Sequence, residues 1–244
     1  MRSVRLISLL LFLMVWQGAA VIADSNTLPS PWAVFVSFWG HLTAGDLLYH
    51  LGMTLMRVAV SFALAMVLGV ALGILMGSRK HWDDWLDGLL ILGLNIPALV
   101  TIILCYIWFG LTEVAAVLAV AVNKIPTVVV AMREGARAVD RSLLEVAQVY
   151  RLPRKQVFFQ VYLPQLYPYL FGAARNGLAL IWKIVLVVEL LGRSNGVGFQ
   201  LGTFFQFFDI KSLLAYTFAF VLVIFVIEAV LMRPLEQHLN RWRS

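Results

Sequence analysis

MREGARAVDRSLLEVAQVYRLPRKQVFFQVYLP, residues Met132 to Pro164, is a long polar interruption in a chain that is otherwise mostly apolar. The apolar segments before and after it are about 20 residues long, the length that a helix rising about 1.5 Å per residue needs to cross the hydrocarbon core. We therefore expect this segment to lie outside the bilayer, between two membrane-spanning helices.

The first half of the segment has helical periodicity. Leu144, Ala147 and Tyr150 recur on one side of a helix, whereas Glu145 and Gln148 point away from it. This pattern predicts a short amphipathic helix at 144–150.

A second short helix is predicted after a break at Arg151-Leu152-Pro153. It begins at Arg154, has an apolar stripe within 157–162, and is expected to end at Leu163-Pro164 because proline disfavours helical backbone in the residue before it. Two short helices at an angle, exposed between spans, indicate a docking element.

The order Glu145-x-Ala147, turn, apolar positions and Leu163-Pro164 resembles the cytoplasmic EAA loop of bacterial ABC importer permeases. In that family a short coupling helix of the loop sits in a groove of the ATPase subunit. The resemblance implies that the residues coupling this chain to an ATPase are Leu144, Glu145, Ala147, Gln148, Tyr150, Arg151, Leu163 and Pro164.

One residue departs from the family pattern. The family usually has glycine at the turn, where this chain has Arg151. Glycine adopts left-handed backbone freely, whereas a residue with a Cβ does so at a cost of about 1 kcal/mol. A different construction of the turn is therefore an open expectation.

Composition alone assigns the chain to integral membrane proteins. Its 244 residues are 61% hydrophobic and 13% charged, with a mean hydropathy of +0.88, which leaves no room for a sizeable soluble domain. The net charge of +6 is spread over span ends, so the positive-inside rule explains it better than nucleic-acid binding. The single cysteine, Cys105, excludes a disulfide within the chain.

The expected fold is all-α, a polytopic membrane protein of about six transmembrane helices with a cytoplasmic two-helix coupling loop. Residues 1–23 are a first span or a cleavable signal peptide, and residues 24–50 are a periplasmic segment with an interfacial helix near Trp32 to His41. Residues 51–235 form the permease core with the coupling loop at 133–164, and residues 236–244 form a cytoplasmic tail.

Within the core, the span from about Leu51 to Met76 carries a small residue at every fourth position, which places these residues on one side of a helix. They are Ser61, Ala65, Gly69, Gly73 and Gly77. Such a ridge favours close approach of a second helix in lipid.

Four further features are expected to interrupt or separate the spans. Asn95-Ile96-Pro97 and Lys124-Ile125-Pro126 each break a span, because proline frees a carbonyl group and kinks a helix. Arg79 to Asp84 is predicted to be a short polar turn on the inside, and the glycine-rich stretch Gly192 to Gly198 a flexible exterior loop.

The distribution of cations predicts the orientation. The inside would hold Arg2, Arg5, Arg79, Lys80, Arg133, Arg137, Arg141, Arg151, Arg154, Lys155, Arg233, Arg241 and Arg243, against Arg193 and Lys211 outside. This asymmetry places both termini and the polar loop in the cytoplasm.

Further pieces resemble the permease branch that handles nitrate, taurine and aliphatic sulfonates. They are Leu28-Pro29-Ser30-Pro31, Thr54-Leu55-x-Arg57-Val58, Asn95-Ile96-Pro97, Trp108-Phe109-Gly110-Leu111-x-Glu113, Gly177-Leu178 with Trp182, Glu189 and Gly196-x-Gly198. The resemblance covers about residues 28 to 243, and Lys124 stands where an aromatic residue is usual.

Charged groups at membrane depth are candidates for the translocation pathway, because they are costly there unless a partner or a wet cavity receives them. The candidates are Arg57, Lys124, Arg175, Trp182, Lys183 and Glu189. Gly172, Arg175, Ala179, Trp182, Leu186, Glu189 and Arg193 form one stripe of the fifth span. Structural roles remain the alternative: pairing of Glu189 with Arg193, snorkelling of Arg175 to the interface, or positions near span ends for Arg57 and Glu228.

The sequence contains no HExxH motif, no histidine pair at metal-ligand spacing and no phosphate-binding loop, so it predicts neither an enzyme nor a resident cofactor or metal. The resemblance implies an importer of the bacterial inner membrane, with a second copy of the chain, two ABC ATPase subunits that carry ATP and Mg, and a periplasmic solute-binding protein. The solute would be small and anionic. An ATP-independent channel or facilitator, a membrane enzyme and a membrane scaffold remain as alternatives.

Overall fold

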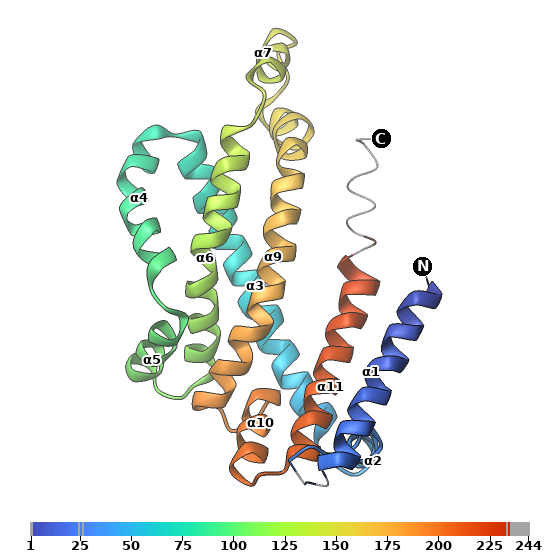
Figure 1. The fold of residues 1–244 in the computed structure, drawn as a ribbon. Helices are drawn as coiled ribbons and strands as arrows, with labels where there is room; N and C mark the ends of the chain where they lie inside the picture. Colours follow the sequence, from blue (N-terminus) through green and yellow to red (C-terminus); the bar gives the residue numbers. More distant parts are fainter. Residues whose placement is uncertain (1, 24, 26, 233, 235–244) are drawn as a thin grey trace. The chain divides into compact units, whose positions relative to one another are not determined.

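A computed structural model describes residues 2–23, 25, 27–232 and 234. All regular elements in these ranges are helices (Figure 1). The chain divides into two compact units. The first contains residues 1–55 and 189–226, and the second contains residues 56–188 and 227–244.

The first unit combines an N-terminal part of the chain with a part close to its C-terminal end. Its elements are α1 (Arg2–Ala23), α2 (Pro31–Thr43), the first turns of α3 (Leu47–Ser78), α10 (Val197–Gln206) and α11 (Ile210–Ile227). The expected helix near Trp32 is confirmed: Ser30 caps α2 by accepting a hydrogen bond from the Ala33 N–H, and Pro31 occupies its first position. Trp32 and Trp39 are both exposed.

The second unit holds the remainder of α3 and the central elements. These are α4 (Lys80–Asn95), α5 (Ala98–Phe109), α6 (Glu113–Arg137), α7 (Arg141–Val149), α8 (Arg154–Gln156), the π-helix η1 (Val157–Tyr162), α9 (Leu163–Gly192) and the π-helix η2 (Glu228–Met232). The predicted tail at 236–244 and Arg233 lie outside the described residues.

Among the described residues, four helical segments are long and apolar enough to cross a membrane: Leu47–Ser78, Glu113–Arg137, Arg154–Gly192 and Ile210–Val230. Helices α4 and α5 together pass the same test but are bent by 99° between Asn95 and Ala98. A shorter apolar helix, Ile7–Ala23, precedes them. With the bent pair counted as one span, the described residues give five candidates, one fewer than the expected six, because this apolar N-terminal helix is shorter than a span requires.

The ridge of small residues on α3 is confirmed as a packing surface. A Cβ built on Gly69 would lie 2.6 Å from Val128 Cβ, and one on Gly73 would lie 2.6 Å from Met132 Cβ. Gly77 faces Ala136 at the same distance. Helices α3 and α6 therefore run parallel with their backbones in close approach, which small residues permit in a membrane.

The two proline sites behave differently. The expected break at Asn95-Ile96-Pro97 is confirmed, since Ile96 has extended backbone with ψ 123° and ends α4. The break expected at Lys124-Ile125-Pro126 was wrong, because α6 continues through Pro126. The Pro126 ring packs against Gly93, where a Cβ would lie 2.9 Å from Pro126 Cγ.

The polar turn predicted at Arg79–Asp84 was also wrong, since these residues begin α4. Arg133 Nη1 lies 2.6 Å from Asp87 Oδ1 and 3.3 Å from Asp83 Oδ1, and Arg137 also pairs with Asp83. This ionic cluster ties the start of α4 to the end of α6.

The second half of the polar loop differs from its prediction too. Leu163-Pro164 does not end a helix, because α8, η1 and α9 follow one another without interruption. The Leu163 N–H donates to the Phe158 carbonyl, five residues back, as in a π-helix. The wider π-turn makes room for a proline ring that would otherwise meet the carbonyl one α-turn earlier.

The close packing of α3 on α6 predicts that Gly73→Ala destabilises the protein. The added Cβ would lie 2.8 Å from the Val129 carbonyl oxygen as well as against Met132, and backbone cannot move aside as a side chain does. We expect a loss of about 1–3 kcal/mol, the usual cost of overpacking, measured as a lower Tm of the purified protein in detergent.

Gly52→Ala is the matched control on the same helix, because nothing lies within 4 Å of a Cβ at Gly52. Its Tm is expected to stay at the wild-type value. Equal Tm values for Gly73→Ala and Gly52→Ala would contradict this account of the α3–α6 contact.

Candidate coupling surface and buried charges

Helix α7 begins with a capped turn. The Asp140 carboxylate accepts hydrogen bonds from the Ser142 hydroxyl (2.7 Å) and from the Ser142 N–H (2.8 Å). These two bonds, the side-chain bond foremost, lower the pKa of Asp140. The ionised carboxylate at this N-terminus fixes where the helix starts.

The end of α7 is a Schellman motif with arginine in the position that favours glycine. The Leu152 N–H donates to the Ala147 carbonyl (3.0 Å), and the Arg151 N–H donates to the Gln148 carbonyl (2.9 Å). Arg151 has φ 51°, in the left-handed region. The turn therefore keeps the backbone that the family's glycine would adopt, and the expectation of a different construction was wrong.

The faces of α7 are arranged differently from the prediction. Ala147 is buried and α7 packs against η1, whereas Tyr150, expected on the same side, is 75% exposed. Leu143, Val146 and Val149 are exposed as well, so α7 presents a strip of apolar side chains to its surroundings. In Figure 1, α7 projects beyond the ends of α6 and α9 within the second unit.

The other predicted coupling residues lie around this helix. Glu145 and Gln148 are exposed as expected, and Leu144 is half-buried. Leu163 is half-buried and Pro164 exposed within the first turn of α9 rather than at the end of a helix. The apolar strip therefore lies on α7, whereas the Leu163-Pro164 pair lies on a different helix, α9.

The buried arginine of α3 has an acidic partner that sequence analysis did not single out. Arg57 is 1% exposed, and its Nη2 and Nε donate to the two Glu113 carboxylate oxygens at 2.6 and 2.8 Å. This bidentate pair joins α3 to the first turn of α6, where a carboxylate is also favoured by the helix dipole. The sequence feature that could have predicted this partner was Glu113 itself, an acidic residue directly after the Thr112 N-cap.

Glu189 is buried at the end of α9 and caps α10. Its Oε2 accepts from the Gly198 N–H (2.9 Å) and lies 2.9 Å from Thr54 Oγ1, which in turn accepts from the Val197 N–H (2.8 Å). The Gly196 N–H donates to His50 Nδ1 at 3.0 Å. Three successive N–H groups at the start of α10 are therefore satisfied by side chains of the first unit.

This network corrects the expectation of a flexible glycine-rich loop, since Gly196, Val197 and Gly198 are all buried. Gly196 has φ 106°, and a Cβ there would collide with the Glu189 carboxylate. Glycine is required at this position by both its backbone and its neighbour. Sequence analysis missed Thr54 and His50 as partners, and no local pattern links them to residue 196.

The remaining pathway candidates do not share one environment. Arg175 Nη2 lies 3.1 Å from Glu228 Oε1, with both side chains partly exposed. Trp182 is buried, whereas Lys183 is exposed. Gly172 and Ala179 on the predicted stripe are exposed, so the stripe of α9 passes through several environments, and its role as a pathway stays a prediction.

Lys124 differs from the other cations at membrane depth. It lies in the middle of α6 and is 4% exposed. A cation at the centre of a span costs about 2.5–3.5 kcal/mol on insertion scales unless a partner compensates it. Within the described part of the chain, Lys124 Nζ forms neither an ion pair nor a hydrogen bond.

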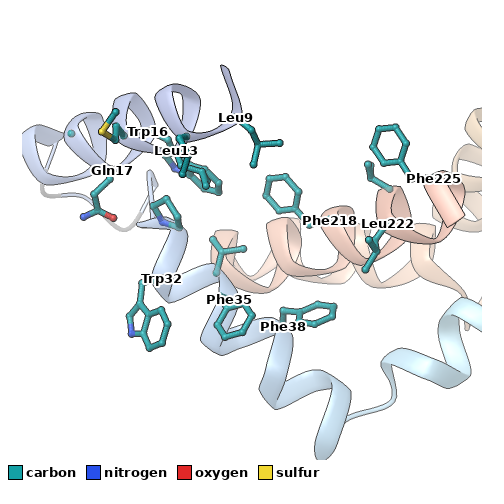
Figure 2. A pocket seen from close by; sticks show the side chains of 16 residues that line it. Leu9, Leu13, Trp16, Gln17, Trp32, Phe35, Phe38, Phe218, Leu222 and Phe225 are labelled. Atoms are coloured by element: carbon teal, nitrogen blue, oxygen red, sulfur yellow. The ribbon is translucent and has the colours of Figure 1, made fainter. Parts of the chain in front are cut away.

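An apolar cavity of about 1200 Å³ lies in the first unit, between α1, α2 and α11 (Figure 2). Leu9, Leu13, Phe35, Phe218 and Leu222 are among its walls. Figure 2 labels Gln17 among otherwise apolar and aromatic side chains. These walls suit hydrocarbon and offer little to a charged solute.

The positive φ of Arg151 predicts the effect of substituting it. Arg151→Gly should stabilise the C-terminus of α7 by about 1 kcal/mol, because glycine adopts left-handed backbone without a Cβ penalty. Hydrogen exchange of the amides at 151 and 152 is expected to slow. Arg151→Val is the opposite case, since a branched Cβ makes positive φ an outlier, and faster exchange in Arg151→Gly than in Arg151→Val would contradict the motif.

The cap on α10 predicts a graded response at position 189. Glu189→Gln keeps an oxygen that accepts from the Gly198 N–H, whereas Glu189→Ala leaves that buried donor unsatisfied at a cost of about 1–3 kcal/mol. We expect hydrogen exchange at 196–200 to be faster in Glu189→Ala and close to wild type in Glu189→Gln. Equal hydrogen-exchange rates in the wild type, Glu189→Gln and Glu189→Ala would show that Glu189 does not cap α10.

Comparisons with known proteins agree with this arrangement. The putative aliphatic sulfonates transport permease protein SsuC of Bacillus subtilis (strain 168) is 31% identical over 232 residues, covering 94% of this chain and 84% of that protein. The nitrate import permease protein NrtB of Synechocystis sp. (strain ATCC 27184 / PCC 6803 / Kazusa) is 31% identical over 202 residues, covering 79% and 73%.

Among solved structures, a chain of the MetNI methionine ABC transporter in an inward-facing conformation matches with a TM-score of 0.66 at 18% identity, covering 80% of this chain and 96% of that one. This likeness shows the fold. The family model described as binding-protein-dependent transport system inner membrane component matches residues 65–241. With most of its length matched, this chain belongs to that family of membrane-spanning transport permeases.

Proposed function

We propose that this chain is the permease subunit of an ATP-driven importer and that α7 is the element through which a separate ATPase drives it. The observation that carries the proposal is the apolar strip of α7, with Val149 and Tyr150 79% and 75% exposed on a helix that projects from the second unit. An apolar strip outside the bilayer is the usual mark of a binding surface.

The chemistry around α7 describes the partner. Arg141, Arg151, Arg154 and Lys155 are all exposed on or next to α7, against the exposed acids Asp140 and Glu145, so this segment carries a net positive charge. The complementary surface on an ATPase is an apolar groove with an acidic rim. The cation asymmetry of the sequence supports a cytoplasmic position for this loop and for both termini, in the inner membrane of a bacterium.

The assembly proposed is a pair of these chains, two ABC ATPase subunits and a solute-binding protein on the opposite side. ATP and Mg belong to the ATPase subunits, which leaves this chain without a cofactor. The family's dependence on a binding protein supports the last partner. Only the resemblance implies that the two permease chains are identical to each other. A pair of two different permeases is the alternative arrangement.

Helix continuity supplies a route for the force. Helix α7 packs against η1, which runs without interruption into α9. A displacement of α7 by the ATPase would therefore be passed to a membrane-spanning helix as a rigid element rather than lost in a flexible linker. Rocking of packed helices in this way is the usual basis of alternating access.

The solute proposed is a small molecule that carries an oxyanion group, such as a sulfonate, taurine or nitrate. The two relatives above are named for transport of aliphatic sulfonates and of nitrate. Sulfonates and nitrate both carry a negative charge that is shared over several oxygen atoms. Such solutes suit a membrane segment with cations at depth. Selection among such solutes falls largely to the binding protein.

The docking role predicts that Val149→Asp combined with Tyr150→Asp releases the ATPase. Both side chains are exposed, so the change should leave the permease itself folded. Placing two carboxylates in an apolar interface costs at least about 2 kcal/mol, so we expect at least a tenfold loss of ATPase in the purified complex.

Phe205→Asp is the matched control, because Phe205 is 64% exposed on α10, outside the docking loop. It should copurify with normal amounts of ATPase. A complex that retains its ATPase in the Val149→Asp, Tyr150→Asp variant would count against α7 as the docking element.

A further inference from the structure

Lys124 occupies a position enclosed by one unit of the chain. It lies midway along α6, with α9 on one side: a Cβ built on Gly177 would be 3.2 Å from Lys124 Cε and 3.7 Å from Phe62 Cε2. Gly177 therefore provides the space that the lysine side chain fills between α9 and α3. Its enclosure needs no second copy of the chain.

The other three cations at this depth each have a clear means of compensation. Arg57 pairs with Glu113, Arg175 pairs with Glu228, and Lys183 is exposed. Lys124 is as buried as Arg57 but has no carboxylate partner among the described residues. Its hydrogen-bonding partner is thus absent from the described chain, although its ammonium offers three donors.

A buried cation of this kind selects for an anion. An ammonium group binds as a compact point charge, without the planar geometry that matches an arginine to a carboxylate. It suits a small group whose negative charge is spread over several oxygens, because any of these oxygens accepts a charge-assisted hydrogen bond.

We propose that Lys124 is the counter-charge for the oxyanion group of the transported solute, and so a specificity-determining residue of the pathway. The inference rests on the proposed function. It assigns this role to Lys124 and not to Lys183, whose side chain is exposed.

The two sides of Lys124 are packed differently. The α3–α6 contact on the same unit is fixed by backbone packing, whereas Gly177 leaves the α9 side of Lys124 without a Cβ contact. Helix α9 is continuous with η1, against which α7 packs, so the helix beside Lys124 is the one that a displacement of α7 would reach.

The experiment uses the full complex of permease, ATPase and binding protein in proteoliposomes, with ethanesulfonate, taurine and nitrate as probes. Wild type must first accumulate at least one of them with ATP, which tests the proposed function separately. Lys124→Met, which removes the charge at similar volume, is then expected to raise the transport KM or lower the uptake rate at least about tenfold, the effect of losing a charge-assisted hydrogen bond. ATPase activity without solute should stay at the wild-type rate.

Lys211→Met is the matched control, because Lys211 is an exposed lysine at the start of α11 that is not among the pathway candidates; it should transport as wild type does. Uptake by Lys124→Met within twofold of wild type would overturn the counter-charge role while leaving the permease function in place. If Lys124→Met and Lys124→Gln both fail to assemble, the lysine serves the fold, and the proposal is overturned as well. Absence of ATP-driven uptake of every probe by wild type would overturn it together with the proposed solute class.

Discussion

The approach of α3 to α6 through glycine is the constraint on which the second unit depends. Lipid tails are as apolar as leucine, so helices in a membrane gain little from hiding apolar surface and must gain from close packing instead. Gly69, Gly73 and Gly77 allow α6 to lie against the α3 backbone. The same helix α6 carries Lys124 at its centre and leads into α7, so this contact positions both features of the unit.

How much of this could be read from the sequence varies with the range of the interaction. The ridge on α3 was predictable because a four-residue period is local and visible. The different effects of the two prolines could not be predicted in this way. Pro97 follows an extended Ile96, whereas Pro126 lies in a continuous helix against Gly93. What distinguishes them is the neighbour supplied by another helix, which no local pattern encodes.

The coupling loop illustrates a second limit. Its amphipathic first helix was predictable, whereas the expected different turn was wrong, because Arg151 keeps left-handed backbone. The end of the second helix was not predictable, because a π-turn absorbs Pro164 and lets the helix run on. This continuity decides the mechanical argument, since it makes η1, against which α7 packs, part of the same helix as a membrane span.

Charges at membrane depth divide by what the fold brings to them. The sequence did not show which of Arg57, Lys124 and Arg175 has a carboxylate partner, because pairing depends on residues 53 to 56 positions away, as with Arg175–Glu228 and Arg57–Glu113. The fold supplies carboxylates to both arginines and none, among the described residues, to the lysine. Paired charges fix helices to one another, and a charge without a partner keeps its donors for something that arrives and leaves. The proposed role of Lys124 depends on a group of the second kind, so the difference between these cations carries more weight than their number.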